Sequence, residues 1–253
     1  MLEQMSDNKK FIVFLSWSTG VSLVVAYIFS VLEINNAFVS DEFFFALFSG
    51  VFASFFVMLL SEIKRYIDAK RLAEDALYGL LLKMYIELMG EVGNTTMFLQ
   101  NKSQIVPGAL LDSRAPILSN LNASLRVFNY APFKKTPLYN TLVRFKQNEV
   151  SKIDVHINSL GYLHQAVILT QLDAAKKGHL SYNPIASDYL VEVALKKIKA
   201  GAELQMKALE GLITALAAEY PKRYNWSVDK KNFETVQFNM CEQDERRKAF
   251  FEQ

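Results

Sequence analysis

Two long apolar runs, followed by a longer amphipathic remainder, dominate the pattern of hydrophobic and polar positions. Residues 11–32 and residues 43–60 each contain no Asp, Glu, Lys, Arg or His. At about 1.5 Å of rise per helical residue, a run of roughly 20 apolar residues matches a hydrocarbon core of about 30 Å. The segment between them, residues 33–42, is short and permits only a tight turn that returns the chain to the membrane. The pattern therefore predicts a transmembrane helical hairpin over residues 11–64.

The charged residues that flank the two runs indicate an orientation. Lys9 and Lys10 precede the first run, Lys64 and Arg65 follow the second, and residues 33–42 contain no Lys or Arg. The positive-inside rule then places both chain termini in the cytoplasm, with residues 1–10 as a short cytoplasmic lead. A cleaved signal peptide is the alternative for the first run, but the run is too long and lacks a small-residue cleavage site at its end.

Small side chains recur along both runs. In the first run they occupy every fourth position: Ser18, Ser22, Ala26 and Ser30. In the second run they are Ala46, Gly50, Ala53 and Ser54. Small residues spaced in this way let helix backbones approach closely, so helix packing is the favoured interpretation for the second run, with its Phe side chains facing lipid or a neighbouring subunit. For the first run, which has more hydroxyl groups than packing requires, both helix packing and the lining of a pore remain open.

Acidic residues mark the loop that is expected outside the membrane. Glu33, Asp41 and Glu42 would ring the outer mouth of a pore and raise the local concentration of cations. Neither apolar run contains an ionisable side chain, which argues against a proton relay or a transporter built on buried charges.

Beyond residue 64 the apolar residues follow helical spacing. Because no proline occurs between the second run and Pro107, that run is expected to continue as one helix to about Gly90. Proline and glycine positions then predict a short helix from Pro116, a long helix over residues 137–177 and another over residues 184–220, the last two forming an antiparallel pair. The expected fold is an all-α membrane protein, with a cytoplasmic helical bundle over residues 65–221. The tail, residues 222–253, fits a short helix better than a strand.

Composition and motifs supply little evidence for catalysis. The formal net charge is +2, there is one cysteine, and no phosphate-binding loop, nucleophile elbow or zinc motif occurs. His156, His164 and His179 are expected to be ordinary core or surface histidines. We therefore expect a protein that is not an enzyme and that needs no cofactor or metal.

One basic loop is a candidate ligand site. Its cations include Arg126, Lys134, Lys135, Arg144 and Lys146, and they are interleaved with Phe128, Tyr130 and Phe133. Such a loop holds a nucleotide or a short oligonucleotide by stacking and phosphate contact. The alternative is an ordinary solvated loop whose aromatic side chains pack into the bundle.

The layout of a hairpin over residues 11–60 with an acidic outer turn, followed by a helical cytoplasmic part, resembles a group of bacterial anti-phage defence proteins. These are the two-transmembrane membrane effectors of the SLATT-like and Hailong types. The resemblance rests on the layout and on no diagnostic motif, so no functional residue is carried over. It implies an oligomeric channel or pore that depolarises the bacterial inner membrane when a nucleotide signal from a partner enzyme changes.

Two hypotheses follow for the function. The first is a homo-oligomeric channel gated by its cytoplasmic domain, built from roughly four or more copies because the two helices of one subunit cannot enclose an aqueous path. The second is a membrane-anchored scaffold, in which the hairpin tethers a helical bundle that recruits a cytoplasmic protein partner.

Overall fold

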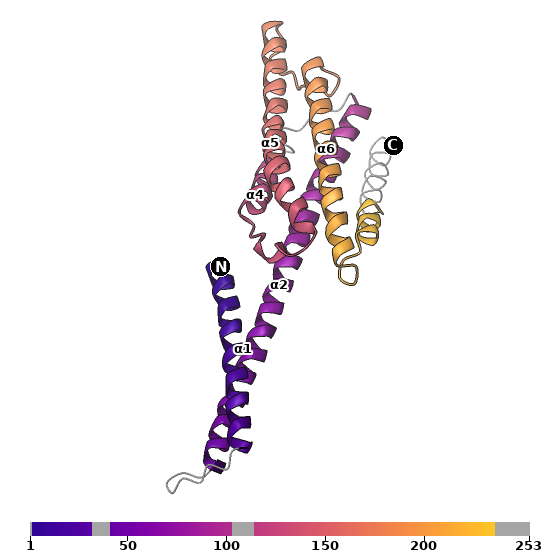
Figure 1. Cartoon of the computed structure of the whole chain (residues 1–253). Helices are drawn as coiled ribbons and strands as arrows, with labels where there is room; N and C mark the ends of the chain where they lie inside the picture. Colours follow the sequence, from indigo (N-terminus) through magenta and orange to yellow (C-terminus); the bar gives the residue numbers. More distant parts are fainter. Residues whose placement is uncertain (1, 32–40, 103–113, 236–253) are drawn as a thin grey trace. The chain divides into compact units, whose positions relative to one another are not determined.

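The computed structural model describes residues 2–31, 41–102 and 114–235, and within these residues every regular element is helical (Figure 1). The elements are α1 (Leu2–Val31), α2 (Asp41–Gln100), α4 (Arg114–Val127), the short 3₁₀ helix η1 (Ala131–Phe133), α5 (Leu138–Lys176) and α6 (Tyr189–Glu219). Residues 226–235 are also helical. The all-α class expected from the sequence is confirmed.

The chain divides into two compact units, residues 1–75 and residues 76–253. The first unit contains α1 and the first part of α2. Both helices carry a stretch that is long and apolar enough to cross a membrane, Lys10–Ile28 in α1 and a stretch of α2 that begins at Ala46. The polar lead, residues 2–10, is part of α1 and not a separate segment.

Helix α2 belongs to both units because it is 60 residues long and continuous. It extends to Gln100, well beyond Gly90, where the sequence analysis expected it to end. Neither Gly90 nor Gly93 stops it, because the side chains that follow these glycines remain part of the interior of the second unit. Glu91, Thr95 and Phe98 are all buried there.

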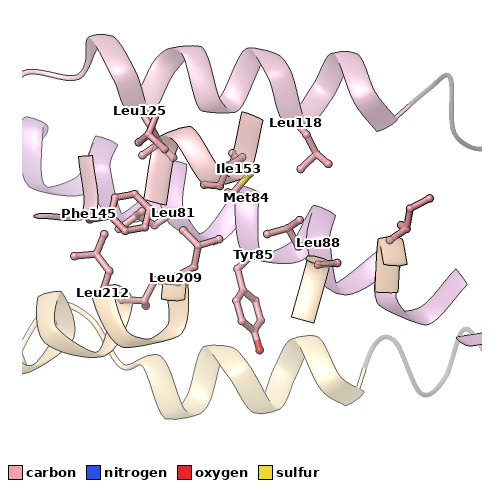
Figure 2. Packing of buried hydrophobic residues seen from close by; sticks show 14 of the residues in the cluster. Leu81, Met84, Tyr85, Leu88, Leu118, Leu125, Phe145, Ile153, Leu209 and Leu212 are labelled. Atoms are coloured by element: carbon pink, nitrogen blue, oxygen red, sulfur yellow. The ribbon is translucent and has the colours of Figure 1, made fainter. Parts of the chain in front are cut away.

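The second unit is a bundle whose core is built from one face of each helix (Figure 2). Helix α2 contributes buried residues at three- and four-residue spacing: Leu77, Leu81, Met84 and Leu88. Helices α4, α5 and α6 contribute Leu118, Leu125, Phe145, Ile153, Leu209 and Leu212, among others. This regular spacing explains why the elements form helices, because each one buries a continuous apolar stripe.

Helices α5 and α6 are the predicted pair of long helices, and Gly178 ends the first of them. Its φ of +91° lies in the left-handed region that glycine adopts at low cost. The amides of Gly178 and His179 donate to the carbonyl oxygens of Ala175 and Ala174, each at 3.0 Å, which satisfies the last turn of α5. Gly161 does not interrupt α5.

Helix α6 begins later than expected, at Tyr189 and not near Pro184. The cause is Asp188, whose carboxylate accepts hydrogen bonds from the Tyr182 hydroxyl (2.9 Å) and from the Ile185 amide (2.8 Å). These bonds stabilise a turn in front of the helix, so the Pro184 region is loop.

Part of the tail packs on the bundle through aromatic contacts. The Tyr224 ring stacks on the Tyr78 ring, with centroids 4.2 Å apart, and the Trp226 ring meets Tyr85 edge-on at 5.0 Å. The Tyr78 hydroxyl also donates to Asp229 at 2.6 Å. The expected short helix in the tail is present over residues 226–235, and the alternating residues 236–240 lie outside the described part of the chain.

Candidate functional site

The predicted pore stripe of α1 lies largely on the buried side of the first unit. Ser22 and Ala26 are buried, together with Leu15 and Thr19, and Ser18 is half-buried. The Ser22 hydroxyl donates to the Ser18 carbonyl oxygen at 2.8 Å. The stripe is therefore a contact face within the single chain, and the Ser22 hydroxyl bonds to the helix backbone. The side chain of Ser30 lies outside the described residues.

The small residues of α2 have the opposite environment. Ala46, Gly50, Ala53 and Ser54 are all exposed in the single chain. The partly buried side of α2 in the first unit includes instead the larger residues Phe48, Phe52, Phe55 and Leu59. The small residues are thus not the packing face within the chain, because the larger side chains make more dispersion contacts there. Packing of another helix against the small residues stays a prediction.

The acidic residues assigned to an outer mouth fall at the edge of the described chain. Glu33 lies outside the described residues. Asp41 and Glu42 are the first two residues of α2, and their side chains are not described. Acidic residues at this position favour the helix, because the N-terminal end of the helix dipole is positive.

The basic loop does not form a stacking platform. Phe133 is fully buried, and Tyr130 is buried with its hydroxyl donating to the Leu125 carbonyl oxygen at 3.0 Å. Burial raises the pKa of Tyr130 to about 12. Phe128 is half-buried against the Tyr130 ring. Of the two alternatives for this loop, burial supports the packing of its aromatic side chains into the bundle, because Tyr130 and Phe133 are part of the core.

The cations of this loop have different roles. Arg126 forms an ion pair with Asp154 of α5, and Asp154 also accepts a hydrogen bond from the Asn122 amide at 2.6 Å. This pairing connects α4 to α5. Lys134, Lys135 and Arg144 are exposed. Contact of these three with a phosphate stays a prediction.

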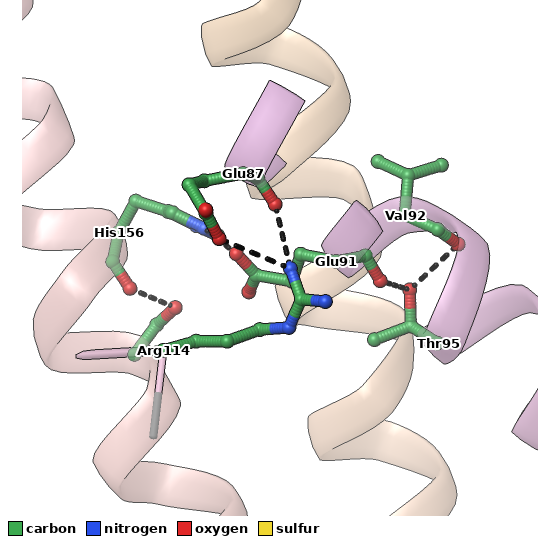
Figure 3. Close-up of polar contacts among 7 residues, drawn as sticks. Glu87, Glu91, Val92, Thr95, Arg114 and His156 are labelled. Carbon is green, nitrogen blue, oxygen red and sulfur yellow. Dashed lines mark hydrogen bonds and ion pairs between the residues drawn. The ribbon is translucent and has the colours of Figure 1, made fainter. Parts of the chain in front are cut away.

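The sequence analysis missed a buried polar cluster in the second unit, where three helices meet (Figure 3). The Glu91 carboxylate of α2 lies 3.2 Å from His156 Nε2 of α5, and both side chains are almost fully buried. Gln205 of α6 is buried as well. Among the described residues, Glu91 Oε1, His156 Nδ1 and Gln205 Oε1 have no hydrogen-bond partner. We call Glu91 and His156, whose imidazole packs against α6, the buried polar cluster.

A glycine makes room for the histidine. A Cβ placed on Gly201 of α6 would lie only 2.6 Å from His156 Nδ1. The imidazole therefore packs directly on the backbone of α6, one turn before Gln205. This close approach requires glycine at position 201.

A second polar contact joins α2 to α4 beside the cluster. Arg114 donates to the Glu87 carbonyl oxygen at 2.9 Å, and its guanidinium lies 3.5 Å from the Glu87 carboxylate. Gly90 permits this arrangement, because a Cβ there would lie 2.8 Å from Arg114 Nη1. Polar side chains on one turn of α2 therefore contact both α4 and α5.

The spacing of residues in the sequence is enough to mark the positions of these buried polar residues. Glu91 follows Met84 and Leu88 on the inner face of α2, His156 follows Ile153 on α5, and Gln205 lies between Ala202 and Leu209 on α6. Each polar residue therefore occupies a position where the helical pattern requires an apolar one. His164 and His179, by contrast, are exposed.

Comparison of the chain with family models, with curated proteins and with solved structures found no match.

Proposed function

We propose that the chain is a homo-oligomeric membrane channel or pore, with α1 and the first part of α2 as its membrane hairpin and with a gate controlled by the cytoplasmic bundle. The termini lie in the cytoplasm in this proposal, and the membrane is the bacterial inner membrane. Because its layout resembles that of two-transmembrane defence effectors, the proposed role is to depolarise that membrane during anti-phage defence.

The observation that carries the proposal is the continuity of α2. One uninterrupted helix contains an apolar stretch fit to cross a membrane and, further along, the buried residues Leu77 to Leu88 at the centre of the bundle. In the proposal, a displacement of the buried part of α2 reaches the apolar stretch along this one helix. A simple tether does not need this continuity.

The polar contacts of α2 supply an element that a signal can act on. Glu87 and Glu91, one turn apart, bind Arg114 of α4 and His156 of α5. A ligand or partner that binds the open arrangement of the bundle more tightly than the closed one, by about 5.5 kcal/mol, shifts the population from 1:99 to 99:1. Exposed Lys134 and Lys135 are the cations of this bundle with which a nucleotide signal would pair.

The scaffold hypothesis is favoured by one observation of its own. Ser22 and Ala26 are buried within the single chain, and the Ser22 hydroxyl bonds to the helix backbone. A pore lined by this stripe requires α1 to turn its buried side toward the axis of an assembly. A tethered bundle requires no such change.

Cation flux distinguishes the two hypotheses. The purified full chain is reconstituted in liposomes loaded with potassium, and potassium release is measured as the membrane potential is varied. The proposal predicts that potassium is released. It also predicts that the preference of the pore for cations over anions falls when Glu33, Asp41 and Glu42 are changed together to Gln, Asn and Gln. Vesicles that keep their potassium at every potential and with every candidate nucleotide favour the scaffold.

A further inference from the structure

The outer face of α5 carries a long stretch without acidic or strongly basic residues. Residues 155–172 contain no Asp, Glu, Lys or Arg, which at about 1.5 Å per residue is roughly 27 Å of helix. Large apolar side chains in this stretch are nevertheless exposed: Val155 69%, Tyr162 60%, Leu169 53% and Leu172 54%. We call this surface the neutral face of α5.

The neutral face of α5 differs in charge from the exposed face of α6. On α6, the exposed residues include Lys196, Lys197, Glu203 and Lys207, which surround the exposed Leu204 with charge. Interface cores are depleted of charged residues and enriched in Tyr, whereas an ordinary solvated helix face is charged. The neutral face therefore has the composition of an interface.

The spacing along the neutral face suits a helix partner. Val155, Tyr162 and Leu169 are seven residues apart, and Asn158, Gln165 and Leu172 repeat at the same interval three residues later. This is the a and d pattern of helices that pack side by side. Gly161 lies beside the seam with open space above it, so a second backbone can approach closely.

The neutral face ends in a groove. Ile168, Leu172, Leu180 and Tyr182 are among the residues that line it, and its volume is about 500 Å³. Leu180 is 86% exposed. Apolar surface thus continues from α5 into the turn that follows it.

We propose that the neutral face binds the same face of a second copy of this chain. A face without acidic or strongly basic residues does not repel its own copy, and the side-chain amides of Asn158 and Gln165 both donate and accept, so each can pair with its counterpart. A lipid surface fits less well, because helices that lie on membranes carry Lys and Arg beside their apolar side. The inference rests on the proposed homo-oligomer and names one of its contacts.

Disulfide cross-linking tests the contact directly. In a Cys241→Ser background of the full chain in native membranes, Tyr162→Cys lies near the middle of the seam. Oxidation is expected to convert most of this variant to a covalent dimer. The control is Leu204→Cys, because Leu204 is also 60% exposed but lies on α6. It is expected to stay monomeric on a denaturing gel.

A charge placed on the face gives a second, independent readout. Leu169→Glu is expected to at least halve the mass of the particle in detergent, because it places two like charges opposite each other. Leu204→Glu is expected to leave the mass unchanged. Circular dichroism shows whether each variant keeps its helical content, so a loss of mass is separated from a loss of fold.

Three results would overturn the inference: equal cross-linking at positions 162 and 204, a particle mass that Leu169→Glu does not change, or a label on position 162 that is quenched by brominated lipid. The last result would assign the face to the membrane. Covalent dimers at position 162 without potassium release would contradict the channel and leave this contact standing. Potassium release without such dimers would contradict this contact and leave the channel standing.

Discussion

The Glu91 carboxylate of α2 and the His156 imidazole of α5 lie 3.2 Å apart in the core of the bundle. Removing one member of a buried pair leaves the other without its partner, which costs about 3–5 kcal/mol. Glu91→Leu is therefore expected to lower the thermal unfolding midpoint of the second unit strongly.

The double variant Glu91→Leu, His156→Leu is expected to recover most of that loss, because replacing both members by apolar residues is often neutral or stabilising. Circular dichroism on the full chain in detergent measures both midpoints. If Glu91→Leu melts like the parent, the pair contributes nothing to the fold.

Two glycines on α6 provide a matched comparison. Gly201→Ala places a Cβ 2.6 Å from His156 Nδ1, so the side chains must shift, at a cost of about 1–3 kcal/mol. Gly211→Ala meets nothing within 4 Å, and alanine favours a helix over glycine by about 0.8–1.0 kcal/mol. The first variant is expected to lower the unfolding midpoint and the second to raise it. Similar shifts in both would show that His156 does not pack on Gly201.

The burial of Tyr130 leads us to expect that the free energy of unfolding falls at alkaline pH. Burial raises its pKa to about 12, whereas an unfolded tyrosine titrates near 10. Its contribution is therefore complete below about pH 10 and is lost as the pH rises through about 12. Ionisation of Tyr78 also lowers the stability at alkaline pH, because burial and its hydrogen bond to Asp229 raise its pKa.

The absorbance of tyrosinate measures this effect. A titration step near pH 12 in the parent is expected to disappear in Tyr130→Phe, which keeps the ring in the core. A parent titration with every tyrosine complete by about pH 11 would contradict the burial of this hydroxyl.

The membrane orientation is tested by labelling. In the Cys241→Ser background, Asn35→Cys is expected to react with an impermeant maleimide added outside intact cells. Ser227→Cys, at an exposed position of the second unit, is expected to react only after the cells are permeabilised. The reverse order of labelling would invert the topology.

Local pattern predicted the helices well and the polar interior poorly. Runs such as Leu77, Leu81, Met84 and Leu88 bury one face of a helix, so their spacing alone identifies the element and its inner side. The late start of α6 depended on Asp188, which bonds to Tyr182 and Ile185 in a turn that spacing does not encode.

The candidate site was harder to predict because its residues come from different helices. Glu91 of α2 and His156 of α5 each look like an isolated irregularity, and only the fold brings the two side chains together, 3.2 Å apart. For the aromatic residues of the basic loop, the sequence left two alternatives open. Their mixture with Lys134 and Lys135 suggested a ligand, but Phe133 and Tyr130 supply core area that this small bundle requires.

Single-channel recording of the purified full chain in planar bilayers tests the central claim most directly. The account predicts discrete cation currents in the parent that persist in Ser22→Ala, which removes only the bond to the Ser18 carbonyl oxygen. Ser22→Leu is expected to abolish the current while the oligomer keeps its mass in detergent. An absence of current from intact oligomers at every potential, with and without nucleotides, would contradict the channel and favour the membrane-anchored scaffold.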